Sequence, residues 1–386
     1  MEHRRAIPLL SNHHISESCG FLLPNPLVRL PEEFEAWNFL AENLEDLLLK
    51  HELRRRVDEM SLCDHRRLTG HRQQRLAYTF LCFIGNGYIW QEGDACAAKV
   101  VPKQLAIPWC AVSEALGLRP AASHAGCVLS NYKLINPNGN ITTLVRFPGG
   151  KHCDWFFMVT AQVELTAVKG LKAIITAMHG VVEDDIEVTT KALRHLRESI
   201  REMKEVFSRM HDGLDADVFY NTMRPFLSGW GGEGSALPEG VIYEGVSSEP
   251  VQVTGGSAAQ SSPIMAFDAA LGVQHGGKPS DFLAKMRQYM PPAHRDFIAA
   301  VENGPSIRAY VKEREENAKL NAVYHDCVHA MKDFRSYHIQ IVVKYVVVMS
   351  NRRKASFSYE GVAERGTGGQ AFMPFLKSLR DSTSCE

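Results

Sequence analysis

The sequence lacks several features that would assign it to a familiar class. Its nine cysteines are an odd number without a C-x-x-C pair, which argues against a disulfide framework. The formal net charge is only −1, so no strong field favours nucleic acid or an anionic membrane. The longest apolar run, 341–349, is interrupted by Lys344 and cannot cross a bilayer. The N-terminal residues are too poor in apolar side chains for a signal peptide. These absences predict a cytoplasmic protein with reduced thiols and with neither a nucleic-acid nor a membrane partner.

The spacing of apolar residues is helical over most of the chain. The 386 residues are 45% hydrophobic and 23% charged, as in an ordinary globular protein. Helical patterns cover 31–60 and 72–91, and they fill almost all of 153–349. The one clear strand-like stretch is 132–151, where Asn-Gly and Pro-Gly-Gly turns flank alternating apolar residues. We therefore predict an all-α fold with a minor β-hairpin.

The strand-like stretch also suggests a domain boundary. We expect a small N-terminal helical domain over 1–148 and a large C-terminal helical bundle over 149–386. The large domain would include a linker at 228–259, rich in Gly, Ser and Pro, and a glycine-rich mobile loop at 350–369.

One helical stretch, 325–349, has a histidine in its apolar stripe. The stripe is spaced alternately by four and three residues and consists of Cys327, Met331, Phe334, His338, Ile341, Tyr345 and Val348. Arg335 lies one turn before His338. A haem site requires this combination, because the imidazole ligates iron, the apolar wall covers the porphyrin and the cation meets a propionate.

Two other interpretations of these histidines remain open at this stage. A lone histidine on an apolar helix face is more often a hydrogen-bonded core residue than a ligand. Alternatively, His325 and His329 stand four residues apart and could hold zinc, with Asp326 as the base. Those two histidines lie off the apolar stripe, however, and no third ligand is evident.

Two further helices offer side chains for a pocket. Phe156 and Thr160 share one face of the helical stretch 153–179, where a hydroxyl among apolar neighbours suits a pocket as well as a core. The short stretch 215–224 carries Phe219, Tyr220 and Arg224. Two aromatic rings and an arginine suit a substrate with an aromatic ring and a carboxylate, although a plain amphipathic helix is an alternative.

The chain as a whole resembles the indoleamine 2,3-dioxygenases. The resemblance rests on segments in order from about residue 20 to 381, among them GFLLPNP, QRLAYTFL, FFMVTAQVE, GGSAAQSS, MRQYMPPAHRDFI, RSYHIQIVVKY, GTGG and FLKSLRD. It implies two helical domains with one b-type haem between them. It also implies oxidation of L-tryptophan with O2 to N-formylkynurenine, the first step of the kynurenine pathway, with an electron donor that reduces the ferric haem.

The resemblance also implies roles for residues around the haem. His338 resembles the proximal iron ligand and therefore the metal-binding residue. Arg335 resembles the partner of a propionate and is itself held by Asp268. Ser257 and Ala258 resemble the loop at the haem edge, where small side chains let backbone approach a flat ring.

On the substrate side, Arg224 resembles the clamp on the tryptophan carboxylate. Phe156 and Phe219 resemble residues that pack on the indole, and Thr367 resembles a closing-loop threonine near the substrate ammonium. These distal residues include no acid or base catalyst, which suits a reaction driven by positioning, water exclusion and tuning of the iron.

Three substrate-side positions match the type-2 rather than the type-1 members of the family. They are His124, Thr160 and Tyr220, where type-1 members have tyrosine, serine and phenylalanine. Because type-2 members are poor tryptophan dioxygenases, we expect low catalytic efficiency. The alternative from a different class is a catalytically weak haem-binding signalling or sensor protein.

Two local features add further expectations. Pro225 follows the clamp directly and should keep Arg224 out of the right-handed helical conformation, so that its guanidinium is re-aimed. The segment Val241–Val246 fits the immunoreceptor tyrosine-based inhibitory pattern, so Tyr243 is a candidate for phosphotyrosine signalling, although an ordinary linker tyrosine is the commoner case.

Overall fold

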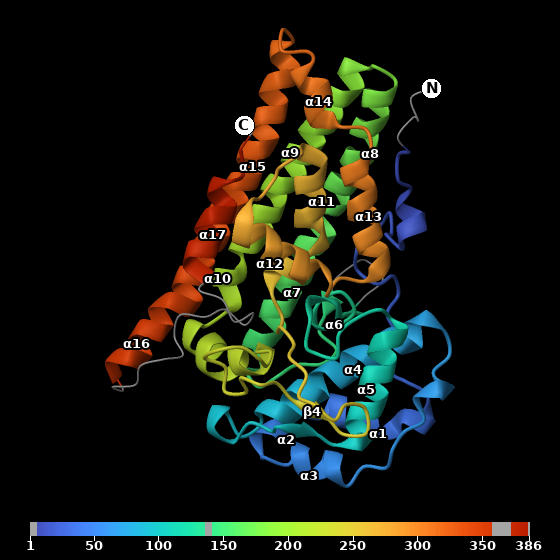
Figure 1. Ribbon diagram of the computed structural model, residues 1–386, viewed down its shortest axis with the longest axis vertical. Helices are drawn as coiled ribbons and strands as arrows, with labels where there is room; N and C mark the ends of the chain where they lie inside the picture. Colours follow the sequence, from blue (N-terminus) through green and yellow to red (C-terminus); the bar gives the residue numbers. More distant parts are fainter. Residues whose placement is uncertain (1–5, 136–140, 357–371, 385–386) are drawn as a thin grey trace.

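The helices form a long upright bundle that stands on a smaller group of helices (Figure 1). The computed structural model describes residues 6–135, 141–356 and 372–384. In this part of the chain the helical fold class predicted from the sequence is confirmed. The N-terminal segment with the short 3-10 helix Leu10–His13 runs along the side of the bundle.

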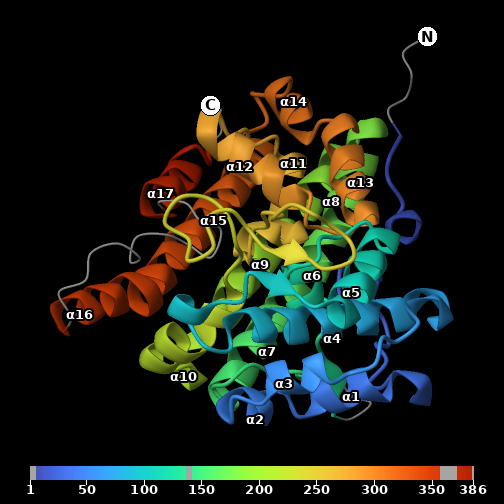
Figure 2. The same cartoon turned by 60° about the horizontal axis from the view of Figure 1, so that its bottom comes forward.

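The smaller group is built around one buried helix. Its helices are α1 (Glu35–Glu42), α2 (Leu44–Leu49), α3 (Leu53–Asp58), α4 (Gly70–Trp90), α5 (Lys103–Ala115) and α6 (His124–Cys127). Figure 2 shows α4 lying between α1–α3 on one side and the bundle on the other, which explains why every residue from Arg75 to Trp90 is buried. Helix α5 crosses α4 closely at Gly85, where a Cβ would lie 2.1 Å from the Trp109 ring.

The bundle contains the remaining helices. They are α7 (Lys151–Thr166), α8 (Val168–Val182), α9 (Ile186–Ser208), α10 (Met210–Gly213), α11 (Ser262–Leu271), α12 (Gly277–Arg287), α13 (Pro292–Asn303), α14 (Ile307–Lys312), α15 (Ala318–Val342), α16 (Val348–Ser356) and α17 (Phe372–Asp381). Side chains cap the long helices, as the Asp185 carboxylate does for α9 and the Asn317 amide for α15. Helix α17 lies along α15, and α16 projects from the bundle (Figure 1).

The predicted β-hairpin is present but short. Strand β2 (Lys133–Leu134) pairs antiparallel with β3 (Ile141–Thr142), and the Asn-Gly turn between them lies outside the described residues. The alternation of apolar residues continues to Phe147 in the sequence, but it does not extend β3. The Asn131 side-chain amide instead bonds both the N–H and the C=O of Val145 at 2.9 Å. Those backbone groups are thus satisfied without a strand partner.

The predicted linker 228–259 is tied to the smaller group. Within it, β4 (Ile242–Tyr243) pairs in parallel with β1 (Val100–Val101), and single bridges join Trp230 to Val253 and Val241 to Val251. A segment rich in glycine and serine thus becomes ordered through backbone pairing rather than through an apolar stripe of its own.

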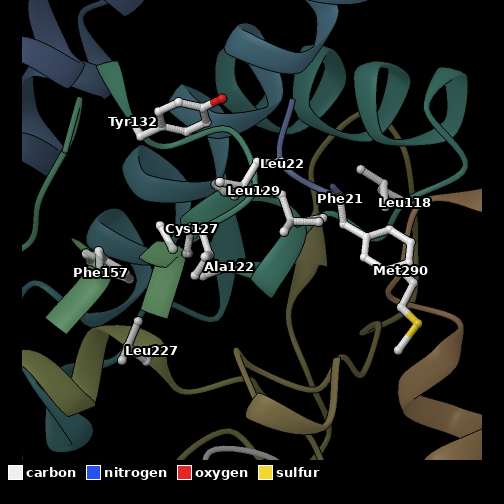
Figure 3. Packing of buried hydrophobic residues seen from close by; sticks show 14 of the residues in the cluster. Phe21, Leu22, Leu118, Ala122, Cys127, Leu129, Tyr132, Phe157, Leu227 and Met290 are labelled. Carbon is white, nitrogen blue, oxygen red and sulfur yellow. The ribbon is translucent and has the colours of Figure 1, made fainter. Parts of the chain in front are cut away.

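The buried apolar residues form one cluster that spans both groups of helices. In Figure 3, Phe21 and Leu22 from the N-terminal segment lie near Leu129 of the smaller group, while Phe157 and Leu227 approach Cys127 from the bundle side. Because the core continues across the predicted boundary at 148/149, that division of the chain stays a prediction.

One helical stretch, Lys151–Val182, is long and apolar enough to cross a membrane by length and composition alone. The apolar pattern of the sequence did not identify this stretch as a candidate membrane span. Half of its apolar window is buried inside the protein, where α7 and α8 pack against α9. Burial of this kind is typical of a core helix.

Candidate functional site

A cavity of about 350 Å³ brings together most of the predicted site residues. It lies among α7, α11, α12, α15 and α17, and apolar side chains form most of its wall. The predicted residues that line it are His124, Phe156, Thr160, Phe219, Arg224, Ser257, Ala258, Asp268, Arg335 and His338. Tyr220 lies behind this lining, and Thr367 lies outside the described residues.

Helix α15 presents His338 to the cavity from an otherwise apolar face. The Phe207 ring packs beside the imidazole at a centroid distance of 5.9 Å. Burial, and secondarily the nearby Arg335 cation, lower the pKa of His338 to about 4. In the described parts of the chain, neither ring nitrogen of His338 has a hydrogen-bond partner. The imidazole is therefore neutral at pH 7, which is the form that ligates a metal.

The apolar stripe predicted over 325–349 is confirmed up to Tyr345 and is wrong at Val348, which begins α16. Val348 is 39% exposed, whereas its neighbour Met349 is 5% exposed. Residues Val343–Val347 form a π-helical turn, which contains an extra residue and shifts the buried face by one position. The expected spacing of four and three assumed an uninterrupted α-helix.

Arg335 lines the cavity one turn before His338, and its charge is balanced by a buried carboxylate. One guanidinium nitrogen, Nη2, bonds Asp268 Oδ2, and the other, Nη1, donates to the Thr383 hydroxyl at 2.7 Å. His275 Nε2 lies 3.3 Å from the same Asp268 oxygen. Burial alone would raise the pKa of Asp268, but Arg335 and His275 outweigh it and lower the pKa. The expected contact between Arg335 and Asp268 is thus present.

Arg224 also lines the cavity and lies near an aromatic ring. Its guanidinium carbon is 5.3 Å from the centroid of Tyr220, which explains how a residue outside the lining still contributes to the site. Burial lowers the pKa of Arg224, whereas the neighbouring Tyr220 and Asp94 act in the opposite direction. A buried guanidinium of this kind favours a carboxylate ligand.

The expected effect of Pro225 on the backbone is wrong. Arg224 has φ −56° and ψ −36°, within the right-handed helical region. The residues before it, Val218–Met223, form a π-helix, and Arg224–Leu227 continue as a 3-10 helix with Pro225 in its first turn. Proline is tolerated in a first turn because the N–H that it lacks would have no helical acceptor there.

The aromatic wall of the cavity includes two rings from different helices. Phe156 of α7 and Phe219 of the π-helix have centroids 5.1 Å apart, and Phe219 also contacts Tyr345 of the second π-helical turn at 6.0 Å. The Thr160 hydroxyl donates to the Phe156 carbonyl at 2.7 Å. Its oxygen can still accept a hydrogen bond from the cavity side.

The sequence interpretation missed a buried carboxylate in the same cavity. Glu164 is 1% exposed, and its Oε1 lies 2.7 Å from both His124 Nε2 and the Ser261 hydroxyl. Its second oxygen, Oε2, has no partner within the part of the chain that the structure describes. A signal existed in the sequence, because Glu164 stands four residues after Thr160 and eight after Phe156 on α7. His124 is thereby tied to the cavity wall from the smaller group of helices.

The small-residue loop before α11 also reaches the cavity. Ser257 and Ala258 line it, and the Ser257 hydroxyl caps the short 3-10 helix Ala258–Gln260 by accepting from Ala259 N–H at 3.2 Å. Gly255 lies so close to the backbone of Leu227 that a Cβ would be 2.2 Å from its carbonyl oxygen. The loop therefore follows the wall tightly because it lacks larger side chains.

Two other motifs are not part of the cavity. His325 and His329 are exposed, and Asp326 pairs with Arg197 at 2.8 Å. Within the described ranges, no group of three or more His, Cys, Asp or Glu residues could hold a metal ion. Tyr243 is 1% exposed, and its hydroxyl donates to the Pro120 carbonyl at 2.6 Å. A kinase could reach this tyrosine only after local unfolding, which argues against the phosphotyrosine interpretation.

The residues of the cavity fit a b-type haem. Of the two histidines that line the cavity, His124 is bonded to Glu164, and His338 offers a neutral imidazole from an apolar wall, as a haem site with a histidine ligand requires. Arg335 uses one N–H toward Asp268 and one toward Thr383, and its other N–H groups have no partner among the described residues. The cavity volume lies within the ~300–1,000 Å³ that is typical of small-molecule and cofactor sites.

Comparisons with known proteins agree along the whole chain. The family model described as indoleamine 2,3-dioxygenase matches residues 9–386. Human indoleamine 2,3-dioxygenase 2 is 43% identical, over 98% of this chain and 96% of the relative. Mouse indoleamine 2,3-dioxygenase 1 is 41% identical, over 97% and 95%. A protein named myoglobin from Haliotis madaka is 39% identical, over 97% of each chain.

Proposed function

This chain belongs to the indoleamine 2,3-dioxygenase family, and we propose that it inserts O2 into the indole 2,3-bond of L-tryptophan to give N-formylkynurenine. One b-type haem per chain would occupy the cavity, with His338 as its axial ligand. The observation that carries this proposal is one cavity lined by a neutral imidazole near one arginine, by a second arginine and by two aromatic rings that contact each other. We also propose a cytoplasmic location and, from the likeness to type-2 members, low catalytic efficiency.

The side chains of the cavity suit the binding of an amino acid with an indole ring. Arg224 would bind the carboxylate, and Phe156 and Phe219 would pack against the ring. A hydroxyl at Thr160 and the backbone of the Ser257–Ala258 loop offer polar groups for the remaining edge. Each contact restricts the substrate to one orientation, which is the main contribution that a protein makes to a reaction of this kind.

The chain contributes positioning rather than acid or base catalysis. Both oxygen atoms remain in N-formylkynurenine and no proton is gained or lost overall, so the reaction needs no proton donor from the solvent. When bound, the haem would supply the iron that activates O2 once an electron donor has reduced it. Apolar side chains around Phe156 and Phe219 would exclude water from the reacting ring. Asp268 would keep the Arg335 cation aimed along the wall where a propionate fits.

A second candidate function is a haem protein that binds O2 or transmits a signal without turnover. The specific observation in its favour is the relative named myoglobin, which is nearly as similar as the relatives named as dioxygenases. The buried Arg224 guanidinium favours the enzyme, because a protein that only bound O2 would not need a buried site for the carboxylate of a substrate.

The test compares three full-length proteins reconstituted with haem: the wild type, His338→Ala and His329→Ala. The last is a matched control, because His329 lies on the same helix and is exposed. With ascorbate and methylene blue as reductant, we expect a Soret band and N-formylkynurenine from the wild type and the control, and neither from His338→Ala. A colourless wild type, or turnover by His338→Ala at the wild-type rate, would contradict the proposal. A Soret band without product would favour the second candidate.

A further inference from the structure

The end of the chain reaches the same buried charges that border the cavity. After α17, Ser382 and Thr383 turn back toward α11 and α15, and Thr383 is only 1% exposed. The Thr383 hydroxyl donates to the Leu379 carbonyl at 2.8 Å and accepts from Arg335 Nη1 at 2.7 Å. The Ser382 hydroxyl lies 2.7 Å from His275 Nδ1.

Both contacts converge on one carboxylate. Arg335 Nη2 and His275 Nε2 approach the same oxygen, Asp268 Oδ2. The set Ser382, Thr383, His275, Arg335 and Asp268, here called the C-terminal latch, thus joins the chain end to α11 and α15 through two parallel routes. Three of its members (Thr383, Arg335 and Asp268) are at most 8% exposed, so water hardly competes for these bonds.

The helix before the latch is a wall of the cavity. Phe375, Leu376 and Leu379 of α17 line it. Phe375 packs edge-to-face on Phe282 of α12 with centroids 4.6 Å apart, and this contact holds the opposite end of α17. The chain end therefore closes one side of the cavity and also fixes the arginine at its border.

We propose that Thr383 is a positioning residue for Arg335 and that docking of the chain end through the C-terminal latch retains the haem. The proposal rests on the function proposed above, because it assumes that haem occupies the cavity. Thr383 and Asp268 take two N–H groups of the guanidinium, and this fixes its plane so that the remaining N–H groups can meet a propionate. Without the Thr383 oxygen, a buried N–H of Arg335 loses its partner and the cation turns away.

Coupling of this kind is reciprocal. If the docked chain end favours haem binding, bound haem must favour the docked chain end by the same factor. Haem should therefore protect α17 from trypsin, which would cut after Lys377 or Arg380 once the helix detaches. A purely structural role of Thr383 would change stability without linking cleavage to haem.

The experiment measures the rate at which haem leaves the reconstituted full-length protein for excess apomyoglobin. Thr383→Val keeps the shape and removes the oxygen, and it should release haem about tenfold faster. Thr383→Ser keeps the hydroxyl and should retain the wild-type rate. Lys377→Ala changes an exposed residue of α17 and serves as the control. Ser382→Ala breaks the second route and should give a smaller increase.

The outcomes separate this inference from the proposed function. A wild type that binds no haem would overturn the proposed function. A wild type that binds haem while folded Thr383→Val releases it at the same rate would overturn only the inference, as would release from Thr383→Ser as fast as from Thr383→Val. If Thr383→Val does not fold, Ser382→Ala decides: an unchanged release rate and unchanged protection of α17 by haem would overturn the inference.

Discussion

The cavity holds its two arginines by different means. The site of Arg335 is here called the regular end, and the site of Arg224 is called the irregular end. Arg335 stands on the α-helix α15 and bonds a buried carboxylate from a second α-helix, α11. Arg224 stands where a π-helix becomes a 3-10 helix, and its guanidinium lies near the ring of Tyr220, with the Asp94 carboxylate also acting on its charge. One cation is fixed by an opposite charge on regular backbone, and the other lies on an aromatic face on irregular backbone.

This difference suits the two ligands that we propose. A propionate belongs to a cofactor that stays bound, so its partner can be held permanently in one orientation. A substrate carboxylate enters and leaves in each turnover, and a contact between a guanidinium and a ring face is weaker than a buried ion pair, so the Arg224 side chain can adjust as the substrate binds. π-helical turns are frequent at functional sites, and here two of them meet through Phe219 and Tyr345.

The largest expected effect is at the regular end. Asp268→Asn removes the charge that balances buried Arg335, which should lower the free energy of unfolding by ~3–5 kcal/mol in urea titrations. Asp326→Asn is the matched control, since the Asp326 side chain is 47% exposed and pairs with Arg197; it should cost less than ~1 kcal/mol. An equal loss of unfolding free energy in the two variants would show that Asp268 does not stabilise the protein through buried Arg335.

The contribution of Asp268 to the free energy of unfolding should decrease at low pH. Burial raises the pKa of this carboxyl, but the combined lowering by Arg335 and His275 is larger. The net pKa therefore lies below the ordinary 3.8. The unfolded state then takes up the proton first, so the contribution is fully present above about pH 4 and is lost as pH falls through the folded-state pKa. The stability difference between wild type and Asp268→Asn should shrink as the pH falls below about 4.

The second effect concerns the irregular end and appears in turnover rather than stability. Arg224→Ala should lower kcat/KM for tryptophan about 100-fold, because a charge-assisted contact to the carboxylate is lost, while the Soret band is unchanged. Arg209→Ala is the control, because Arg209 also lies over an aromatic ring, that of Trp155 at 5.5 Å, but outside the cavity. Loss of haem from Arg224→Ala would contradict the assignment of Arg224 to the substrate and of Arg335 to the haem.

The regular end was predicted more fully from the sequence than the irregular end, where the residues were identified but the backbone was not. Apolar spacing placed His338 and Arg335 on α15 correctly, because an α-helix has one fixed period. It failed at Val348, since a π-turn adds a residue that no local pattern predicts. The expectation for the Arg224 backbone failed for another reason, because Pro225 stands in the first turn of a 3-10 helix, where a helical residue before it is tolerated.

Other parts of the site depend on contacts between distant segments. Glu164 stood on the predicted face of α7, yet only the fold brings it to His124, 40 residues earlier, and to Ser261, 97 residues later. Thr383 was not identified because nothing near it in sequence shows that Arg335 is its partner. The role of Asp268 came from the resemblance alone, whereas Arg224 was also a candidate carboxylate partner because of its aromatic neighbours in the sequence. The geometry adds which residues lie beside each.

A smaller effect tests the shifted register directly. Met349→Ala should lower the free energy of unfolding by about 2 kcal/mol, because Met349 is 5% exposed. Val348→Ala should cost less than ~0.5 kcal/mol, because Val348 is 39% exposed. The reverse order of costs would mean that α15 continues as a regular helix and that the π-turn is not formed.

The smallest effect asks whether the Tyr220 ring orients Arg224. Tyr220→Leu removes the aromatic face, and a cation–π contact of ~1 kcal/mol corresponds to a roughly fivefold increase in KM for tryptophan. Tyr220→Phe keeps the ring and should remain within about twofold of the wild type. Because the ring acts on substrate binding through Arg224, kcat and the Soret band should change little. If Tyr220→Phe were as impaired as Tyr220→Leu, the hydroxyl rather than the ring face would hold the guanidinium, and the contrast between a charge-fixed and a ring-fixed arginine would be lost.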